Sequence, residues 1–219
     1  MVRIGDPSLF IRKNTELLPS PLVPEIRLHV ASDALPLWEM TEEELGEMGL
    51  PPPFWAFAWA GGQALARYIL DHPNVVRGKR VLDFGAGSGL DGIAAAMSGA
   101  AFVLSADIDH FSGEAIRLNA EVNYVSLLVS TDDLVGQPNR GWDVVLVGDM
   151  CYEQPLAGRI ESWLRGFVAD GVTVLIGDPG RTYLPKSGME LLATYNVETT
   201  RALEDNDVRR TNVWRLLKE

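Results

Sequence analysis

The chain has 219 residues, of which 47% are hydrophobic and 22% are charged, and this composition is that of one ordinary globular domain. Its formal net charge of -11, with no run of Lys or Arg longer than two, argues against nucleic acid as a partner. No stretch approaches the roughly 18 apolar residues of a membrane span, and the N-terminus lacks a signal-peptide pattern. One cysteine and three scattered histidines predict neither a disulfide framework nor a metal site. We therefore expect a cytoplasmic protein that binds no membrane.

The N-terminal part of the chain is rich in proline and alternates short apolar patches with turns. Residues 9–18 predict a short helix, and residues 25–30 predict a short strand with alternating apolar positions. A capping box opens a predicted helix of one or two turns over 41–49. We expect residues 1–57 to form an N-terminal extension or lid packed on a core domain that spans 58–219.

An aromatic segment precedes the first long helix. Phe54, Trp55, Phe57 and Trp59 lie within six positions, and residues 63–71 then follow with an apolar helical stripe. Two interpretations of the aromatic segment are open. The rings either fill the core under a sheet, or they form a wall or lid over a ligand.

From residue 79 onward, apolar strands and amphipathic helices alternate at the spacing of βαβ units. Strands are predicted at 81–84, 101–107, 125–129, 142–148 and 172–176, and helices at 93–97, 111–122 and 156–167. Two further strands, 195–203 and 208–217, are separated by a polar turn at 204–207, which predicts an antiparallel hairpin. The sequence therefore predicts an α/β fold with a mostly parallel, Rossmann-like sheet that ends in this hairpin.

A glycine-rich turn follows the first of these strands. Asp83 ends the strand, and Gly85, Gly87 and Gly89 follow at alternate positions. Glycine allows positive φ and removes the Cβ atoms that would keep a ligand from the main chain. Leu90 stands where a dinucleotide turn requires glycine. The pattern is typical of the cofactor turn of seven-stranded S-adenosylmethionine methyltransferases, with another nucleotide ligand or an unliganded turn as the alternatives.

Several carboxylates follow the predicted strands. Asp107 ends the second strand, about 20 residues beyond the glycine turn, where doubly wound folds bind the ribose hydroxyls of a nucleotide. Asp109 is expected to cap the next helix. Asp132 and Asp133 follow the third strand, where one of them can accept from an adenine amino group. Asp83 either orders the glycine turn or accepts from the ammonium group of the cofactor.

Asp149 and Tyr152 follow the fourth strand, and open α/β sheets bind ligands just beyond such strand ends. Methyl transfer to an amine is an in-line displacement that needs a neutral nitrogen beside the methyl group. A carboxylate there attracts and aims an ammonium group, and a phenol ring forms the wall of a narrow channel. Strand-end capping and packing are the alternative roles. Cys151 has no histidine near it and is expected to pack in the core.

Together, Trp59, the glycine turn at 83–89, Asp107, Asp149 and Tyr152 resemble the methyltransferase family 16 lysine methyltransferases. The acidic residue and the aromatic residue three positions later, after the fourth strand, distinguish this family from other methyltransferases. The resemblance implies a seven-stranded class I methyltransferase fold and S-adenosylmethionine as the cofactor.

The same resemblance implies roles for individual residues. Trp55 and Trp59 are expected to lie against the cofactor, the glycine turn to hold its methionine end, and Asp149 with Tyr152 to receive the target lysine. Segments 24–28, 55–65 and 177–181 are similar to one member of the family in particular, which implies one protein as the substrate.

Competing functions remain at this point. Within the same enzyme class, the substrate could be a ribosomal protein or a small molecule. From other classes, the chain could be a nicotinamide-dependent oxidoreductase, which Leu90 argues against, or a cofactor-binding module without activity. We expect a monomer, and the target lysines and the number of methyl groups added do not follow from the sequence.

Overall fold

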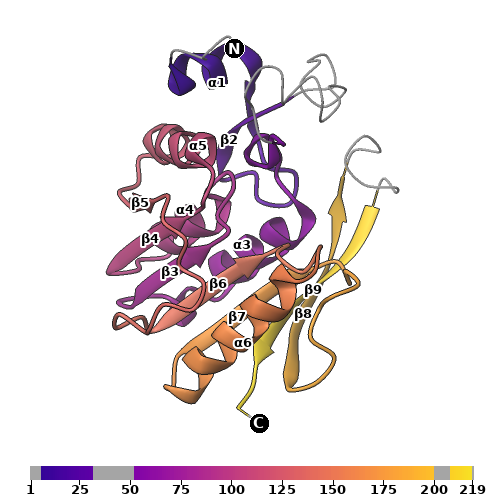
Figure 1. Cartoon of the computed structure of the whole chain (residues 1–219). Coiled ribbons are helices and arrows are strands. Elements are labelled where there is room, and N and C mark those ends of the chain that lie inside the picture. The colour runs from indigo at the N-terminus through magenta and orange to yellow at the C-terminus, as the bar shows by residue number, and fades with distance from the viewer. Residues whose placement is uncertain (1–5, 32–51, 200–207, 219) are drawn as a thin grey trace.

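A computed structural model describes residues 6–31, 52–199 and 208–218 (Figure 1). Its centre is a seven-stranded sheet in the order β5-β4-β3-β6-β7-β9-β8. The strands β3 to β7 pair in parallel, whereas β9 is antiparallel to both β7 and β8. The bounds are β3 Arg80–Phe84, β4 Phe102–Ala106, β5 Leu128–Ser130, β6 Val144–Gly148, β7 Thr173–Asp178, β8 Met189–Glu198 and β9 Val208–Leu216. The predicted α/β fold, a mostly parallel Rossmann-like sheet that ends in two antiparallel strands, is confirmed.

Helices cover both faces of this sheet because side chains alternate along each buried strand. On β6, Val144 and Leu146 pack into one core cluster, whereas Val145 and Val147 pack into the other. The first cluster joins α3 (Ala60–Asp71) and α4 (Leu90–Met97) to the sheet, and the second joins α6 (Leu156–Ala169). In Figure 1, α6 accordingly lies in front of the sheet and α3 behind it.

The N-terminal elements pack against α5 (His110–Val122). They are α1 Pro7–Asn14, β2 Arg27–Val30 and the 3-10 helix η1 Phe54–Ala56, and β1 Glu16–Pro19 joins them through its pairing with β2. Ile11, Trp55 and Phe111 share a third core cluster, in which the rings of Trp55 and Phe111 are stacked with centroids 6.3 Å apart. The described parts of the N-terminal extension are thus packed on the core, and the boundary at residue 57 remains a prediction.

The helix predicted over 9–18 is wrong at both ends. It begins at Pro7, because the Asp6 side chain accepts hydrogen bonds from the backbone N–H groups of Ser8 and Leu9. It ends at Asn14, because β1 pairs with β2 in antiparallel register from Glu16 opposite Val30. Tertiary pairing therefore converts the second half of the predicted helix into a strand.

The third strand is shifted from its predicted range of 125–129 to β5, Leu128–Ser130. Tyr124 has φ 57°, and the Val125 N–H still donates to the Ala120 carbonyl 3.1 Å away, so these residues end α5. The apolar character of Val125 and Leu127 comes from packing beside the core and not from strand pairing.

The last strand, β9, agrees with its predicted range of 208–217 to within one residue, whereas β8 lies earlier in the chain than the predicted 195–203. β8 begins at Met189, six residues before the predicted start, and pairs with β9 up to Glu198 opposite Val208. An irregularity between Leu191 and Ala193 interrupts the alternation that would have revealed this strand. The predicted helix at 41–49 and the turn at 204–207 lie outside the described residues. No helix in the described ranges is long and apolar enough to cross a membrane.

Candidate functional site

A pocket of about 520 Å³ opens at the carboxyl ends of β3, β4 and β6. This is the edge at which open α/β sheets bind ligands. Its wall is formed by the glycine turn, the segment after β4, the residues after β5, the segment after β6, and side chains from η1, α6 and the end of β7. The predicted site residues fall into two groups, those that line this pocket and those that support it.

The glycine turn supplies part of the pocket wall. Gly85 and Gly87 line it and have φ values of 67° and 50°, which L-residues with side chains rarely adopt. A Cβ on Gly87 would have only the Phe54 carbonyl oxygen within 4 Å, at 3.9 Å, so its free side faces open space. Gly89 instead begins α4 with φ 82°, and a Cβ there would lie 3.1 Å from the Ile116 side chain. A Cβ on Gly85 would collide with the Met150 side chain. The open side of Gly87 therefore faces the pocket, whereas Gly85 lies against Met150 and Gly89 against α5.

Asp83 supports the glycine turn from behind. Its Oδ2 accepts from the Gly92 N–H at 3.0 Å and from the Ser105 hydroxyl at 2.8 Å. It is buried and does not line the pocket. Burial raises the pKa of its carboxyl to about 7. Of its two predicted roles, the structure favours ordering the turn.

Asp107 lines the pocket beside the glycine turn. Its Oδ2 accepts from the Gly87 N–H at 2.8 Å, and its Oδ1 accepts from the Asp109 N–H at 3.0 Å. Burial raises the pKa of this carboxyl, and the two backbone N–H groups partly offset that shift. Each carboxylate oxygen keeps acceptor capacity for a further donor. Asp109 caps α5 through the Phe111 N–H, 2.9 Å away, as predicted.

Asp132 and Asp133 line the opposite end of the pocket, after β5. Asp132 Oδ2 accepts from the Ser130 hydroxyl at 2.9 Å, and Asp133 Oδ1 accepts from the Val135 N–H at 3.0 Å. Both side chains are exposed, so either can reach a ligand.

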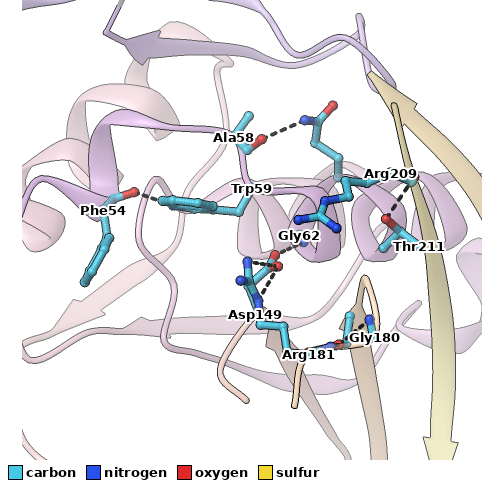
Figure 2. Close-up of polar contacts among 11 residues, drawn as sticks. Phe54, Ala58, Trp59, Gly62, Asp149, Gly180, Arg181, Arg209 and Thr211 are labelled. Atoms are coloured by element: carbon cyan, nitrogen blue, oxygen red, sulfur yellow. Dashed lines mark hydrogen bonds and ion pairs between the residues drawn. The ribbon is translucent and has the colours of Figure 1, made fainter. Parts of the chain in front are cut away.

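The aromatic segment divides between the pocket wall and a core cluster that lies against α5 and not under the sheet. Trp59 and Phe54 line the pocket, and the Trp59 indole N–H donates to the Phe54 carbonyl oxygen at 2.9 Å (Figure 2). Trp55 and Phe57 are buried in the core cluster against α5 and do not line the pocket. Contact with a ligand is therefore available to Trp59, whereas Trp55 fixes the segment in place.

Asp149 lies at the centre of the second group of contacts (Figure 2). Its backbone has φ 59°, and this left-handed conformation turns the carboxylate toward the first turn of α3. Oδ2 accepts from the Gly62 N–H at 3.0 Å, and Oδ1 accepts from the Arg181 guanidinium at 2.8 and 3.3 Å. The residue is only 9% exposed yet lines the pocket.

This contact explains why α3 begins at Ala60 and not at the predicted residue 63. The N-cap residue, Trp59, makes no side-chain cap, and the Asp149 carboxylate accepts from the helix N-terminus in its place. A sequence pattern does not reveal a cap supplied from 87 residues away. The Asp149 carboxylate thus connects the β6 end to the helix that follows Trp59.

Burial raises the pKa of Asp149 to about 6, although the charge of Arg181 and its hydrogen bonds act in the opposite direction. Asp149 is therefore ionised at neutral pH and paired with a cation. Burial also raises the pKa of Cys151 to about 12, which leaves an unreactive thiol and agrees with the predicted packing role.

Tyr152 stands at the pocket mouth, 41% exposed, with its ring centroid 5.9 Å from that of Phe54. Burial raises the pKa of its phenol, so the hydroxyl stays neutral at physiological pH. Phe54 also lies 6.0 Å from Trp59, edge to face. The three rings, which contact one another through Phe54, form an apolar entrance to the pocket.

Sequence reasoning missed several pocket residues. Phe54 was included in the aromatic segment without a specific role. Arg181 was noted only within a segment of family similarity, although its place just after β7 is a strand-end signal of the kind that identified Asp149. Arg159 lines the pocket from α6, where an amphipathic pattern reveals nothing about a ligand.

Three comparisons relate the chain to known proteins. The family described as ribosomal protein L11 methyltransferase matches residues 63–148. The chain is 40% identical to the electron transfer flavoprotein beta subunit lysine methyltransferase of Xenopus laevis, over 95% of this chain and 86% of that protein. It is 37% identical to the human protein of the same name, over 95% of this chain and 82% of the relative.

Among solved structures, the fold is similar to the magnesium protoporphyrin IX methyltransferase of Synechocystis crystallised with bound S-adenosylmethionine. The TM-score is 0.53 at 14% identity, over 84% of this chain and 99% of that one. At this identity the likeness concerns the fold alone. It agrees with the class I methyltransferase architecture that the family resemblance implies.

Proposed function

This chain belongs to the family of electron transfer flavoprotein beta subunit lysine methyltransferases, and we propose that it transfers methyl groups from S-adenosylmethionine to lysine side chains of that flavoprotein subunit. The observation that carries the proposal is the position of Asp149 and Tyr152. Both line the same pocket as the glycine turn, so a nitrogen held by Asp149 lies in the cavity that would hold the cofactor.

The pocket fits S-adenosylmethionine in size and in charge. Its volume of about 520 Å³ lies within the range of small-molecule sites. Five aspartates line it against two arginines, a balance that favours a ligand with a sulfonium and an ammonium group. Gly85 and Gly87 would approach the methionine end, Asp107 would accept from the ribose hydroxyls, and Asp132 or Asp133 would accept from the adenine amino group.

The remaining predicted residues would support that site. Trp59 would form its wall, and Trp55 would hold the aromatic segment against α5. Asp83 and Gly89 would keep the turn in the conformation that brings Gly85 and Gly87 to the ligand. We propose this division of roles on the basis of which side chains line the pocket.

The chemistry requires a neutral lysine nitrogen aligned with the methyl group. S-adenosylmethionine supplies that methyl group as an electrophile bonded to a positively charged sulfur. Asp149 would draw the lysine into the pocket and aim its nitrogen. Tyr152 and Phe54 would flank the aliphatic part of the side chain, because the entrance that they form with Trp59 is apolar.

We also propose that the protein works as a monomer in the cytoplasm and acts on a protein. The acidic net charge of -11 supports a basic, lysine-bearing partner over nucleic acid or an anionic membrane surface.

Methylation assays with labelled S-adenosylmethionine test the proposed substrate. The purified flavoprotein beta subunit, ribosomal protein L11 and a low-molecular-mass cell fraction would be incubated in parallel, with enzyme-free reactions as controls. We expect label on lysines of the flavoprotein subunit, to be mapped by peptide mass spectrometry. Label on L11 or only on small molecules would contradict the proposed substrate, and an absence of label in all three would contradict the transfer activity.

A further inference from the structure

Arg181 forms an ion pair with Asp149, the carboxylate that the target lysine is expected to approach (Figure 2). It follows β7 and lines the same pocket as Asp149. Two guanidinium nitrogens donate to one oxygen, Asp149 Oδ1, at 2.8 and 3.3 Å. The guanidinium carbon also lies 5.8 Å from the Trp59 ring centroid. A resident cation thus already lies within the proposed acceptor site.

The loop after β7 fixes Arg181 in this position. The Asp178 side chain accepts from the backbone N–H groups of Gly180 and Arg181, both at 2.7 Å. These bonds form a tight turn, so the Arg181 backbone is anchored at the sheet edge and its side chain points to Asp149. The ion pair is partly shielded from water, with 21% of the Arg181 side chain and 10% of the Asp149 side chain exposed.

We propose that Arg181 is a positioning residue that neutralises Asp149, so that the incoming lysine is held in its neutral, nucleophilic form. This proposal rests on the proposed function. An unpaired carboxylate would stabilise the ammonium form of the lysine, which has no lone pair to attack with. A carboxylate already paired with a guanidinium can still accept a hydrogen bond from an amine without favouring its protonation to the same extent.

The group transfer is then balanced. The lysine ammonium first loses a proton to water, and the nitrogen lone pair attacks the methyl carbon. The new C–N bond forms as the C–S bond breaks, and the electron pair of the C–S bond returns to sulfur. The positive charge passes from the sulfonium to the methylated ammonium, which leaves with the product.

Arg181 is the cation that forms the ion pair with Asp149, at 2.8 Å, and other ionisable groups lie around this pair. Burial raises the pKa of Asp91, on α4, well above its usual range, and the charges of Asp83 and Asp149 raise it further. Burial also raises the pKa of Cys151 to about 12 and that of Tyr152 above its usual value, so neither side chain adds a charge beside the pair at neutral pH. The remaining charged groups near the pair are Asp178 at the end of β7, whose charge acts on Asp149, Arg159 on α6, which lines the same pocket, and Arg209 on β9, whose side chain points toward the same region in Figure 2.

The pH dependence of turnover tests the proposal. With saturating S-adenosylmethionine and the purified flavoprotein beta subunit, the acid limb of kcat reports the pKa of the bound lysine. We expect Arg181→Gln to move this limb upward by about 1 to 3 pH units, the effect of a charge within about 4–6 Å. At pH values below the acid limbs of both proteins, kcat of Arg181→Gln would be at least about 10-fold lower than that of the wild type. At high pH its kcat would recover. KM for the protein substrate would fall or stay unchanged.

Two further variants sharpen this test. Arg181→Lys keeps the positive charge but cannot donate from two nitrogens to Asp149. The acid limb of its kcat profile is expected to lie between those of the wild type and Arg181→Gln. Arg181→Lys also carries the test if Arg181→Gln fails to fold. The double variant Arg181→Gln with Asp149→Asn removes both charges, and its limb is expected to return toward that of the wild type.

A uniform loss of kcat at every pH, without movement of the limb, would show that Arg181 is only structural and would overturn the proposal. Absence of lysine methylation by the wild-type protein would instead overturn the proposed function, and the role of Arg181 with it. The wild-type reaction is measured first, so the two failures are distinguishable.

Discussion

The two sides of the pocket hold their carboxylates in different ways. On the β4 side, Asp107 accepts from two backbone N–H groups, those of Gly87 and Asp109. On the β6 side, Asp149 accepts from one backbone N–H and from the guanidinium of Arg181. Backbone donors are fixed dipoles without net charge, whereas the guanidinium brings a full positive charge.

This difference suits the two proposed ligands. A hydroxyl group is neutral, and a carboxylate that keeps its negative charge binds it strongly. A lysine must be neutral when it reacts, and a carboxylate already paired with a cation favours that state. We therefore propose that the β4 side would provide affinity for the cofactor and that the β6 side would align the acceptor. The predictions below separate the two sides experimentally.

The largest expected effect is on the β4 side, from Gly87→Arg. The new side chain would enter the pocket, because a Cβ there meets open space and φ is positive. Calorimetry should find no binding of S-adenosylmethionine or its demethylated product. Gly171→Arg is the matched control, since it also has positive φ, at 84°, but precedes β7 at the opposite edge of the sheet. Unchanged affinity in Gly87→Arg would refute the proposed location of the cofactor.

Asp149→Asn should separate turnover from cofactor binding. The variant keeps the shape but loses the negative charge, so turnover is expected to fall roughly 10²-fold or more, the scale of mispositioned reactants. Cofactor affinity by calorimetry should hardly change. The exposed Asp170→Asn serves as the control. Near wild-type turnover, or a loss explained by weaker cofactor binding, would transfer the acceptor role to Glu153 or Asp178.

Asp107→Ala should weaken cofactor binding by about 1–3 kcal/mol, since hydroxyl groups would lose their acceptor in a partly buried site. The N–H groups of Gly87 and Asp109 would also lose theirs. Titration calorimetry of Asp107→Ala beside Asp109→Ala measures the difference. Asp109 caps α5, so its loss should lower stability by about 1 kcal/mol and affect binding less. The reverse ranking would assign the ribose to Asp109.

Substitutions of Tyr152 test the role of the apolar entrance on the β6 side. Tyr152→Phe keeps the ring beside Phe54 and should retain most of the turnover, because the proposed role of Tyr152 depends on its ring and not on its hydroxyl. Tyr152→Ala opens the channel and should reduce kcat/KM for the protein roughly 10-fold, the scale of an aromatic contact with a cation or an apolar chain. Methylation kinetics of both variants decide the point, and equal damage from both would assign a chemical role to the hydroxyl.

The smallest effect concerns Asp83, behind the β4 side. Its folded pKa of about 7 lies above the usual 3.8, so the folded protein binds this proton more tightly than the unfolded chain does. The contribution of this group to the free energy of unfolding is fully present below about pH 4 and is lost as the pH rises through about 7. Asp83→Asn keeps an acceptor for Gly92 and Ser105 and should flatten that loss.

Thermal melts at pH 5 and pH 8 measure the Asp83 effect. The Tm of Asp83→Asn should rise relative to wild type at pH 8, by about 2–4 °C for each kcal/mol gained in a chain of this size. At pH 5 the two proteins should melt more nearly together. If the Tm of Asp83→Asn changes with pH between 4 and 8 as steeply as that of the wild type, Asp83 is not the group responsible for the loss of stability.

Much of the fold and part of the site follow from local sequence signals. The parallel strands carry continuous apolar runs, and the glycine turn, Asp107 and Asp149 each follow a strand at the edge where ligands bind. Their positions are therefore predictable without a structure. The third strand was misplaced because Val125 and Leu127 are apolar for packing reasons, and the first helix was overextended because its second half pairs with β2.

The contacts that distinguish the two sides of the pocket could not be predicted in this way. Arg181 reaches Asp149 from 32 positions along the chain, and Gly62 reaches it from 87. Such pairs depend on the order of strands in the sheet and on the crossing of α3, and no periodicity records them. The division of the aromatic segment between Trp59 in the pocket and Trp55 in the core also depends on where α5 lies.

A seam of glycines lies beneath the β6 side of the pocket. A Cβ on Gly61 would collide with the Gly177 carbonyl, and one on Gly177 would collide with the Gly61 carbonyl. A Cβ on Gly148 would lie 2.9 Å from Asp91 and 3.1 Å from Gly62. For a protein engineer, this floor is closed to variation. Libraries that seek new lysine targets should therefore leave the seam intact and diversify the rim, where Phe54 and Tyr152 are 44% and 41% exposed and can change size without moving a backbone.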